Sequence, residues 1–144
     1  MKIEDILDQW KNDSYIDRTE LGDAALVIPK LHHKYYQIYI NEKLTLRSQE
    51  ADMKKLKLEK YEFFSQGHTE QTRNLGWELP ARGLILKADI PMYMDADKEL
   101  IKLSLKIGIQ QEKIELLESI IKSLTNRGYQ IKSAIDFIKF TMGT

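Results

Sequence analysis

Cysteine is absent from this sequence of 144 residues. Its absence excludes disulfides, thiolate nucleophiles and cysteine-ligated metals, and it fits a reducing cytoplasm, where we expect the protein to reside. No apolar run approaches the roughly 20 residues that a membrane-spanning helix needs, so we expect no contact with a membrane. The first ten residues, MKIEDILDQW, are acidic and amphipathic, unlike a signal peptide.

An excess of either charge is also absent, because 22 lysines and arginines balance 22 aspartates and glutamates. The chain as a whole therefore has no electrostatic preference for nucleic acid. Any binding to nucleic acid must come from a local concentration of basic side chains.

Catalytic and metal-binding patterns are missing too. The sequence has no glycine-rich phosphate-binding loop and no G-x-S-x-G nucleophile turn. The histidines are His32, His33 and His68, and the first two are adjacent. On a helix, adjacent side chains point about 100° apart, so this pair does not form a metal site. We expect neither an enzyme nor a cofactor nor a bound metal.

The strongest pattern that is present is a heptad repeat of apolar residues over 97–142. Only a helix returns such residues to one line, and a sustained period of about 3.5 residues is typical of a seam that faces another helix. At about 1.5 Å per residue the helix would be roughly 70 Å long, so partner helices must cover it. The residues expected to mediate oligomerisation are Leu100, Leu103, Ile107, Ile114, Leu117, Ile121, Leu124, Ile131, Ile135 and Ile138.

A second apolar line runs along the same stretch. It consists of Ile101, Leu105, Ile109, Leu116 and Ile120. A helix with two apolar faces contacts more than one neighbour, so we expect a helical hairpin or coiled-coil bundle within the subunit as well as contacts between subunits. The register continues through Gly128, which favours one unbroken helix over a cap at that glycine.

Two short helices are predicted at the start of the chain. Residues 2–12 place apolar side chains on one face, and a second helix is expected over about 18–28. Asp17 and Glu20 have the spacing of a capping box, with Asp17 as the N-cap of this second helix.

A long helix is predicted next, over about 30–64, and Pro29 suits its first turn. Glycines and prolines then interrupt residues 65–94, which we expect to form an irregular connector with room for one short β-hairpin. Asp95 and Asp97 are candidate N-caps for the last helix.

The chain thus divides into two regions with different expected roles. Residues 1–94 are expected to form a helical region that binds single-stranded DNA, together with the connector. Residues 95–144 are expected to form a helical oligomerisation region.

A basic line on the predicted helix 30–64 supports the first of these roles. Its members recur at helical spacings and are His32, Tyr36, Lys43, Arg47, Lys54, Lys57 and Tyr61. Cations contact phosphates and aromatic rings stack on bases, so this combination is typical of surfaces that hold single-stranded nucleic acid. The segment from Lys43 to Lys60 contains six basic and three acidic residues. The candidate DNA-binding residues are Lys43, Arg47, Lys54, Lys57, Lys60 and Tyr61.

A different interpretation of the same residues stays open. Lysines on a long helix commonly do no more than solvate it, and tyrosines beside an apolar stripe commonly belong to the core. The alternative function is therefore a structural coiled-coil scaffold or assembly protein that binds no DNA. Repetition of the helix in an oligomer would favour DNA binding, because many weak sites on one assembly act together.

The order and spacing of several short motifs resemble the UvsY family of phage recombination mediators. The N-terminal motifs are Lys2-Ile-Glu-Asp-Ile6, Lys11-Asn-Asp13 and Ile16-Asp-Arg-Thr-Glu-Leu21. The C-terminal motif is Asn126-Arg-Gly-Tyr-Gln-Ile-Lys132, which leads through Phe140 to Gly143. The resemblance covers nearly the whole chain except residues 66–94.

The resemblance implies a mainly helical fold and a ring-like homo-oligomer, expected to be a hexamer or heptamer. It also implies a recombination mediator that binds single-stranded DNA and helps load a RecA-like recombinase onto DNA covered by single-strand-binding protein. The implied location is the cytoplasm of the phage's host. Family members bind DNA through basic residues near the end of a helix, where Lys60 matches a basic position. Leu58 departs from the family pattern, and Lys57 lies one residue away.

Overall fold

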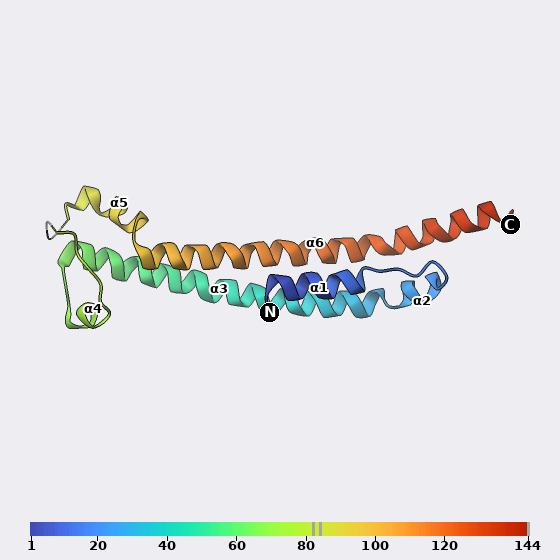
Figure 1. Ribbon diagram of the computed structural model, residues 1–144, viewed down its shortest axis with the longest axis horizontal. Helices are drawn as coiled ribbons and strands as arrows, with labels where there is room; N and C mark the ends of the chain where they lie inside the picture. The colour runs from blue at the N-terminus through green and yellow to red at the C-terminus, as the bar shows by residue number, and fades with distance from the viewer. Residues whose placement is uncertain (82, 84, 144) are drawn as a thin grey trace. The chain divides into compact units, whose positions relative to one another are not determined.

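The computed structural model describes residues 1–81, 83 and 85–143, and these residues are mainly helical (Figure 1). Two long helices, α3 (Ile28–Gln66) and α6 (Lys98–Thr141), account for most of the chain. The shorter elements are α1 (Ile3–Asp13), α2 (Leu21–Leu26), α4 (Glu70–Asn74), the 3-10 helix η1 (Lys87–Asp89) and α5 (Ile90–Asp95). The prediction of a mainly helical fold is confirmed, and α6 continues unbroken through Gly128.

The chain forms two compact units, and each long helix contributes to both. Unit 1 comprises Met1–Lys43 and Gln111–Thr144, and unit 2 comprises Leu44–Gln110. These units do not coincide with the expected regions 1–94 and 95–144, because each unit contains one part of α3 and one part of α6. The assignment of separate roles to those two regions stays a prediction.

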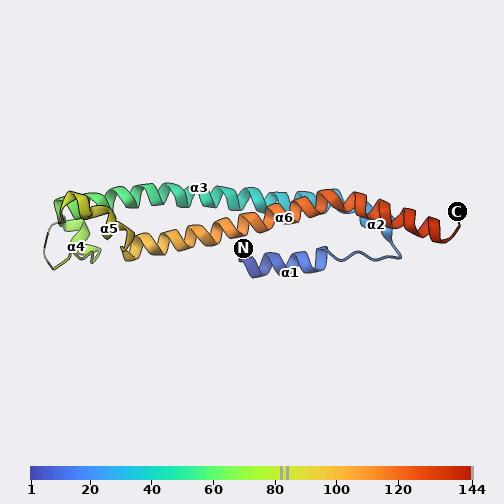
Figure 2. The same ribbon diagram turned by 90° about the horizontal axis from the view of Figure 1, so that it is seen from above.

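Unit 1 contains α1, α2 and parts of α3 and α6, and α1 lies beside the second part of α6 (Figures 1 and 2). Its core contains one residue from α1, Ile6, and one from α3, Tyr35, packed against side chains of α6. Those α6 residues are Leu117, Ile120 and Leu124. Each is at most 2% exposed, so burial of apolar surface holds the three helices together.

Polar contacts fix the pairing of α3 with α6 in unit 1. Lys113 Nζ lies 3.3 Å from Glu42 Oε2, and the hydroxyl of Tyr39 donates to Glu118 Oε1 at 3.0 Å. The partner number on α6 rises as the number on α3 falls, so the two helices run antiparallel here. The prediction of a helical hairpin within the subunit is confirmed.

A polar cluster at the end of α1 adds to this packing. Lys34 Nζ and the Tyr35 hydroxyl donate to Asp13 Oδ2 at 2.6 and 2.7 Å. The guanidinium of Arg127 donates to the Asp13 carbonyl oxygen at 3.0 Å and lies 5.4 Å from the ring centre of Trp10. Because Arg127 is only 5% exposed, this contact ties α6 to the last turn of α1 in a largely water-free setting.

The same cluster shifts three pKa values, and burial lowers that of Arg127. Burial acts to raise the pKa of Asp13, but the hydrogen bonds from Lys34 and Tyr35, with the charges of Lys34 and Arg127, outweigh burial and lower it. Burial raises the pKa of the Tyr35 hydroxyl, and its hydrogen bond to Asp13 raises it further. The ionised form of Asp13 is therefore favoured in the folded chain.

Unit 1 should lose stability in acid through Asp13. A carboxyl whose pKa is lowered by folding stabilises the fold above its ordinary value of 3.8, and this contribution disappears as the pH falls through the lowered value. We expect Asp13→Asn to lose stability at neutral pH and to show a smaller drop between pH about 7 and about 3 than the unsubstituted chain. Urea unfolding at each pH, followed by Trp10 fluorescence in a Trp77→Phe background, measures the stability of both proteins. An equal loss of stability on acidification in the two proteins would contradict the role of Asp13.

Unit 2 is a second hairpin, made of residues 44–66 of α3 and 98–110 of α6 with the connector between them. Its core contains four buried residues, Phe63, Phe64, Trp77 and Ile90. In Figures 1 and 2, α4 and α5 lie around the end of α3. The connector is therefore folded onto the hairpin through its aromatic and apolar side chains.

The structure corrects two local predictions and confirms one. The helix expected over 18–28 is shorter and spans Leu21–Leu26. The Asp17 carboxylate does not cap it, because it accepts the backbone N–H and the hydroxyl of Thr19 at 2.9 and 2.7 Å. The expected β-hairpin in the connector is wrong: the described part of 65–94 holds α4, η1 and α5 and no strand, and positions 82 and 84 lie outside it. Asp97 caps α6 as predicted, accepting the backbone N–H of Leu100 at 3.0 Å.

The seam predicted for oligomerisation is largely buried within the chain, and its role as a contact between subunits stays a prediction. Ile114, Leu117, Leu124 and Ile131 are at most 7% exposed in unit 1, and Leu100 is equally buried in unit 2. These side chains are covered within the chain and have little surface left for another subunit. Of the other seam residues, Leu103, Ile107, Ile121 and Ile135 are half-buried and Ile138 is exposed.

The second apolar line is the one that stays open near the start of α6. Ile101, Leu105 and Ile109 are 43%, 65% and 60% exposed. They lie four residues apart and so share one side of the helix. This exposed row is one apolar surface of unit 2, which also exposes Leu44, Leu58 and Met92.

Candidate nucleic-acid interface

The predicted basic residues of unit 2 lie on the outer surface of α3. Arg47, Lys54 and Lys57 are exposed, and Tyr61 is 36% exposed. Spacings of seven, three and four residues place them close to one side of the helix. A regular helix thus holds three cations and one aromatic ring within reach of a flexible polyanion.

Lys57 lies beside an apolar groove of about 430 Å³. The groove is lined by apolar side chains of α3, α5 and α6, among them Met53, Met94, Ile101 and Leu105, and by one carboxylate, Asp95. Lys57 therefore presents its ammonium group at the edge of an apolar surface.

Lys43, the first of the candidate DNA-binding residues, belongs to unit 1. Its Nζ atom lies 5.2 Å from the ring centre of Tyr39, and the side chain is partly buried. This cation therefore lies beside an aromatic ring and is less exposed than Arg47, Lys54 and Lys57 of unit 2.

Lys60 is placed differently from the sequence-based prediction. It is 3% exposed, and its Nζ atom lies 3.8 Å from the ring centre of Trp77 and 3.0 Å from Asp97 Oδ1. A second carboxylate, of Glu99, lies at 3.7 Å. Lys60 thus has a buried aromatic partner and two anionic partners within unit 2, and its expected role in DNA binding stays a prediction.

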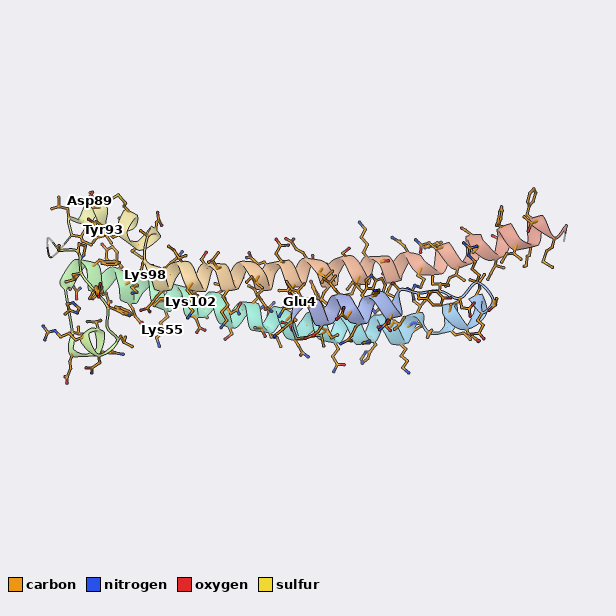
Figure 3. All side chains as sticks on the ribbon, viewed as in Figure 1. Glu4, Lys55, Asp89, Tyr93, Lys98 and Lys102 are labelled. Carbon is orange, nitrogen blue, oxygen red and sulfur yellow. The ribbon has the colours of Figure 1, made fainter. Side chains whose placement is uncertain are left out.

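Lysines on α6 extend the basic surface and were missed by the sequence analysis. Lys98, Lys102 and Lys106 are exposed and recur every fourth residue, which was the signal available. Figure 3 labels Lys98 and Lys102 on α6 and Lys55 on α3. Lys55, Lys102 and Lys106 line a groove of about 680 Å³ together with Asp52, Glu59 and Glu99. These carboxylates, two of which lie on α3, offset the lysines of this groove.

Two further features bear on function. Among the residues that the structure describes, no three histidine or acidic side chains are grouped so that they could hold a metal ion. Within the same part of the chain, no helix has the length and apolar character needed to cross a membrane.

Comparison with known proteins gives a consistent result. The family described as "Recombination, repair and ssDNA binding protein UvsY" matches residues 9–144. Two crystal structures of the bacteriophage T4 recombination mediator protein UvsY are similar in fold, with TM-scores of 0.79 and 0.78 at 22% and 20% identity. The first match covers 99% of this chain and 98% of the T4 chain, and the second covers 98% and 99%. No curated protein sequence matches this chain.

Proposed function

Because the chain belongs to the UvsY family of recombination, repair and single-stranded DNA-binding proteins, we propose that it is a phage recombination mediator that binds single-stranded DNA as a homo-oligomer. The observation that carries the proposal is the exposed basic face of α3, formed by Arg47, Lys54 and Lys57, in a chain that the family covers almost completely. The proposed site acts by binding and carries out no chemical step.

The proposed mechanism is multivalent. Each subunit offers only a few exposed cations, and a short row of phosphate contacts gives weak, salt-sensitive binding. Several identical subunits raise the effective concentration of these sites around one strand, so that the assembly binds far more tightly than a single subunit. A ring of six or seven copies would curve the bound strand.

The proposed consequence is exchange of proteins on the strand. A single-strand-binding protein holds the DNA in one particular conformation. A strand that is also bound and curved by the mediator departs from that conformation, so the single-strand-binding protein binds it less tightly. A RecA-like recombinase can then replace the single-strand-binding protein. We propose these two proteins as partners, in the cytoplasm of the host cell.

The exposed row on α6 is our proposed contact between subunits. Ile101, Leu105 and Ile109 form a line of apolar surface that a neighbouring helix can cover. This proposal replaces the buried heptad seam as the principal association surface in unit 2, and the exposed Ile138 remains a candidate in unit 1.

DNA binding should weaken steeply with salt, and Lys57 should contribute to the slope. Each phosphate contact releases a counterion, so Lys57→Ala should reduce the slope of log affinity against log salt by about 1 per subunit engaged, at every sequence tested. Fluorescence anisotropy with a labelled single-stranded oligonucleotide at several salt concentrations measures this.

The matched control is Lys11→Ala, which removes an exposed lysine at the end of α1 in unit 1. It should leave the slope unchanged. A salt-independent affinity in the unsubstituted protein, or no binding at low salt, would favour the alternative function of a structural scaffold without DNA binding.

A further inference from the structure

Three aromatic side chains and a lysine follow one another along the part of α3 in unit 1. The His32 and Tyr36 rings are stacked, with centroids 5.9 Å apart and an angle of 11° between their planes. The Tyr36 and Tyr39 rings lie 5.9 Å apart at 39°, and Lys43 Nζ lies 5.2 Å from the Tyr39 ring centre. We call these four residues the aromatic ladder.

The ladder is anchored at one end and open in the middle. Tyr39 is partly buried, and its hydroxyl donates to the Glu118 carboxylate at 3.0 Å. The hydroxyl of Tyr36 has no hydrogen-bond partner among the residues that the structure describes, and the side chain is 47% exposed. A ring that is held by neighbouring rings and half open to solvent presents a ready surface for another flat ring.

Packing of unit 1 does not account for the exposure of Tyr36. The adjacent Tyr35 fills the core with no exposed surface, contacts Trp10 edge-to-face at 5.5 Å and bonds to Asp13. Tyr36 points away from this core, because adjacent residues on a helix project about 100° apart. Large exposed aromatic residues are typical of binding surfaces.

The charges around the ladder favour an anionic ligand. Between Ile28 and Lys43, α3 carries three lysines, of which Lys30 is exposed, and one acid, Glu42. That acid is 8% exposed and is paired with Lys113 and the N-terminal amine. Glu118 also lies at the ladder, where it accepts a hydrogen bond from the hydroxyl of Tyr39.

We propose that the aromatic ladder is a base-stacking site for single-stranded DNA, in which Tyr36 stacks on a nucleobase while Lys43 contacts a neighbouring phosphate. The inference rests on the proposed function and deepens it, because it adds a site that recognises bases to a surface that recognises phosphates. Stacking is tolerant of sequence, since every base has a π face, so the site suits a protein that binds strands without sequence preference.

The test compares two strands of equal length and charge: an oligothymidylate and a strand whose sugars carry no bases. The unsubstituted protein should bind the oligothymidylate more tightly. Tyr36→Ala should weaken binding of the oligothymidylate about tenfold and leave binding of the base-free strand unchanged, which corresponds to the loss of one stacked base. Tyr36→Phe keeps the ring and should bind like the unsubstituted protein.

The matched control is Tyr15→Ala, which removes a tyrosine that is 76% exposed outside the ladder and should change neither affinity. Equal affinity of the unsubstituted protein for the two strands, or equal weakening of both by Tyr36→Ala, would overturn the ladder while leaving DNA binding intact. Failure of the unsubstituted protein to bind either strand would overturn the proposed function itself.

Discussion

Lys60→Ala should destabilise unit 2 by about 3 kcal/mol, the order of magnitude for removing one partner of a buried charge pair. The substitution removes the cation that lies 3.8 Å from the Trp77 ring centre and leaves Asp97, only 12% exposed, without its ion-pair partner at 3.0 Å. It also removes the buried methylene groups of the lysine. The connector should therefore detach from α3 at lower denaturant concentration.

The chain offers a direct way to follow this change. Its two tryptophans are divided between the units, with Trp10 in unit 1 and Trp77 in unit 2. In a Trp10→Phe background the remaining fluorescence reports on Trp77 alone, so urea unfolding of unit 2 can be measured with and without Lys60→Ala. An unchanged unfolding midpoint would contradict a stabilising contact between Lys60 of α3 and Trp77 of the connector.

Lys57→Ala is the matched control, because Lys57 lies on the same helix three residues earlier and is exposed. Substitutions at exposed positions usually change stability by less than about 0.5 kcal/mol. The two substitutions should thus have different effects. Lys57→Ala should change the salt dependence of DNA binding, and Lys60→Ala should lower the stability of unit 2.

Leu117→Ala should destabilise unit 1 by about 3 kcal/mol, within the range measured for leucine truncation in close-packed cores. Leu117 has no exposed surface and packs with Ile6, Tyr35 and Leu124. Truncation leaves a cavity between three helices that cannot close without moving their backbones. The effect should appear in urea unfolding followed by Trp10 fluorescence in a Trp77→Phe background.

Leu105→Ala makes the same chemical change on the same helix at a residue that is 65% exposed. It should cost the isolated subunit less than about 0.5 kcal/mol, yet weaken association of subunits if the exposed row is their contact. Sedimentation velocity measures the association. A larger loss of subunit stability from Leu105→Ala than from Leu117→Ala would contradict our assignment of inner and outer apolar lines.

The sequence was a good guide wherever structure depends on local spacing. The heptad repeat predicted one long helix, and α6 indeed runs from Lys98 to Thr141. The second apolar line predicted that this helix has two apolar faces. What the repeat could not tell is which face meets the subunit's own helices, because the spacing required is the same whether the partner helix comes from the same chain or another.

Residue spacing did not predict contacts between side chains that lie far apart in the sequence. Lys60 belongs to a basic run on a helix, and nothing in that run reveals that Trp77, in an irregular connector, packs over its ammonium group. Arg127 likewise lies in a C-terminal helix but bonds to the carbonyl of Asp13. Such contacts follow from tertiary packing, which overrides the expectation that a charged side chain is exposed.

Local hydrogen bonding explains the errors near the start of the chain. Asp17 and Glu20 have the spacing of a capping box, but the Asp17 carboxylate bonds to Thr19 instead and forms a turn. Aspartate side chains bond readily to backbone two residues ahead, and this turn competes with helix initiation. Lys98, Lys102 and Lys106 were missed for another reason. They recur every fourth residue within the heptad repeat, and the apolar residues of that repeat determined the interpretation of the stretch.

The central claim is that several copies of this chain together hold one DNA strand. Native mass spectrometry of the protein mixed with a single-stranded oligonucleotide tests it most directly. The proposal predicts a complex of one strand with six or seven chains, formed at protein concentrations where a single chain does not bind. A stable complex of one chain with one strand, with no larger species at working concentrations, would contradict it.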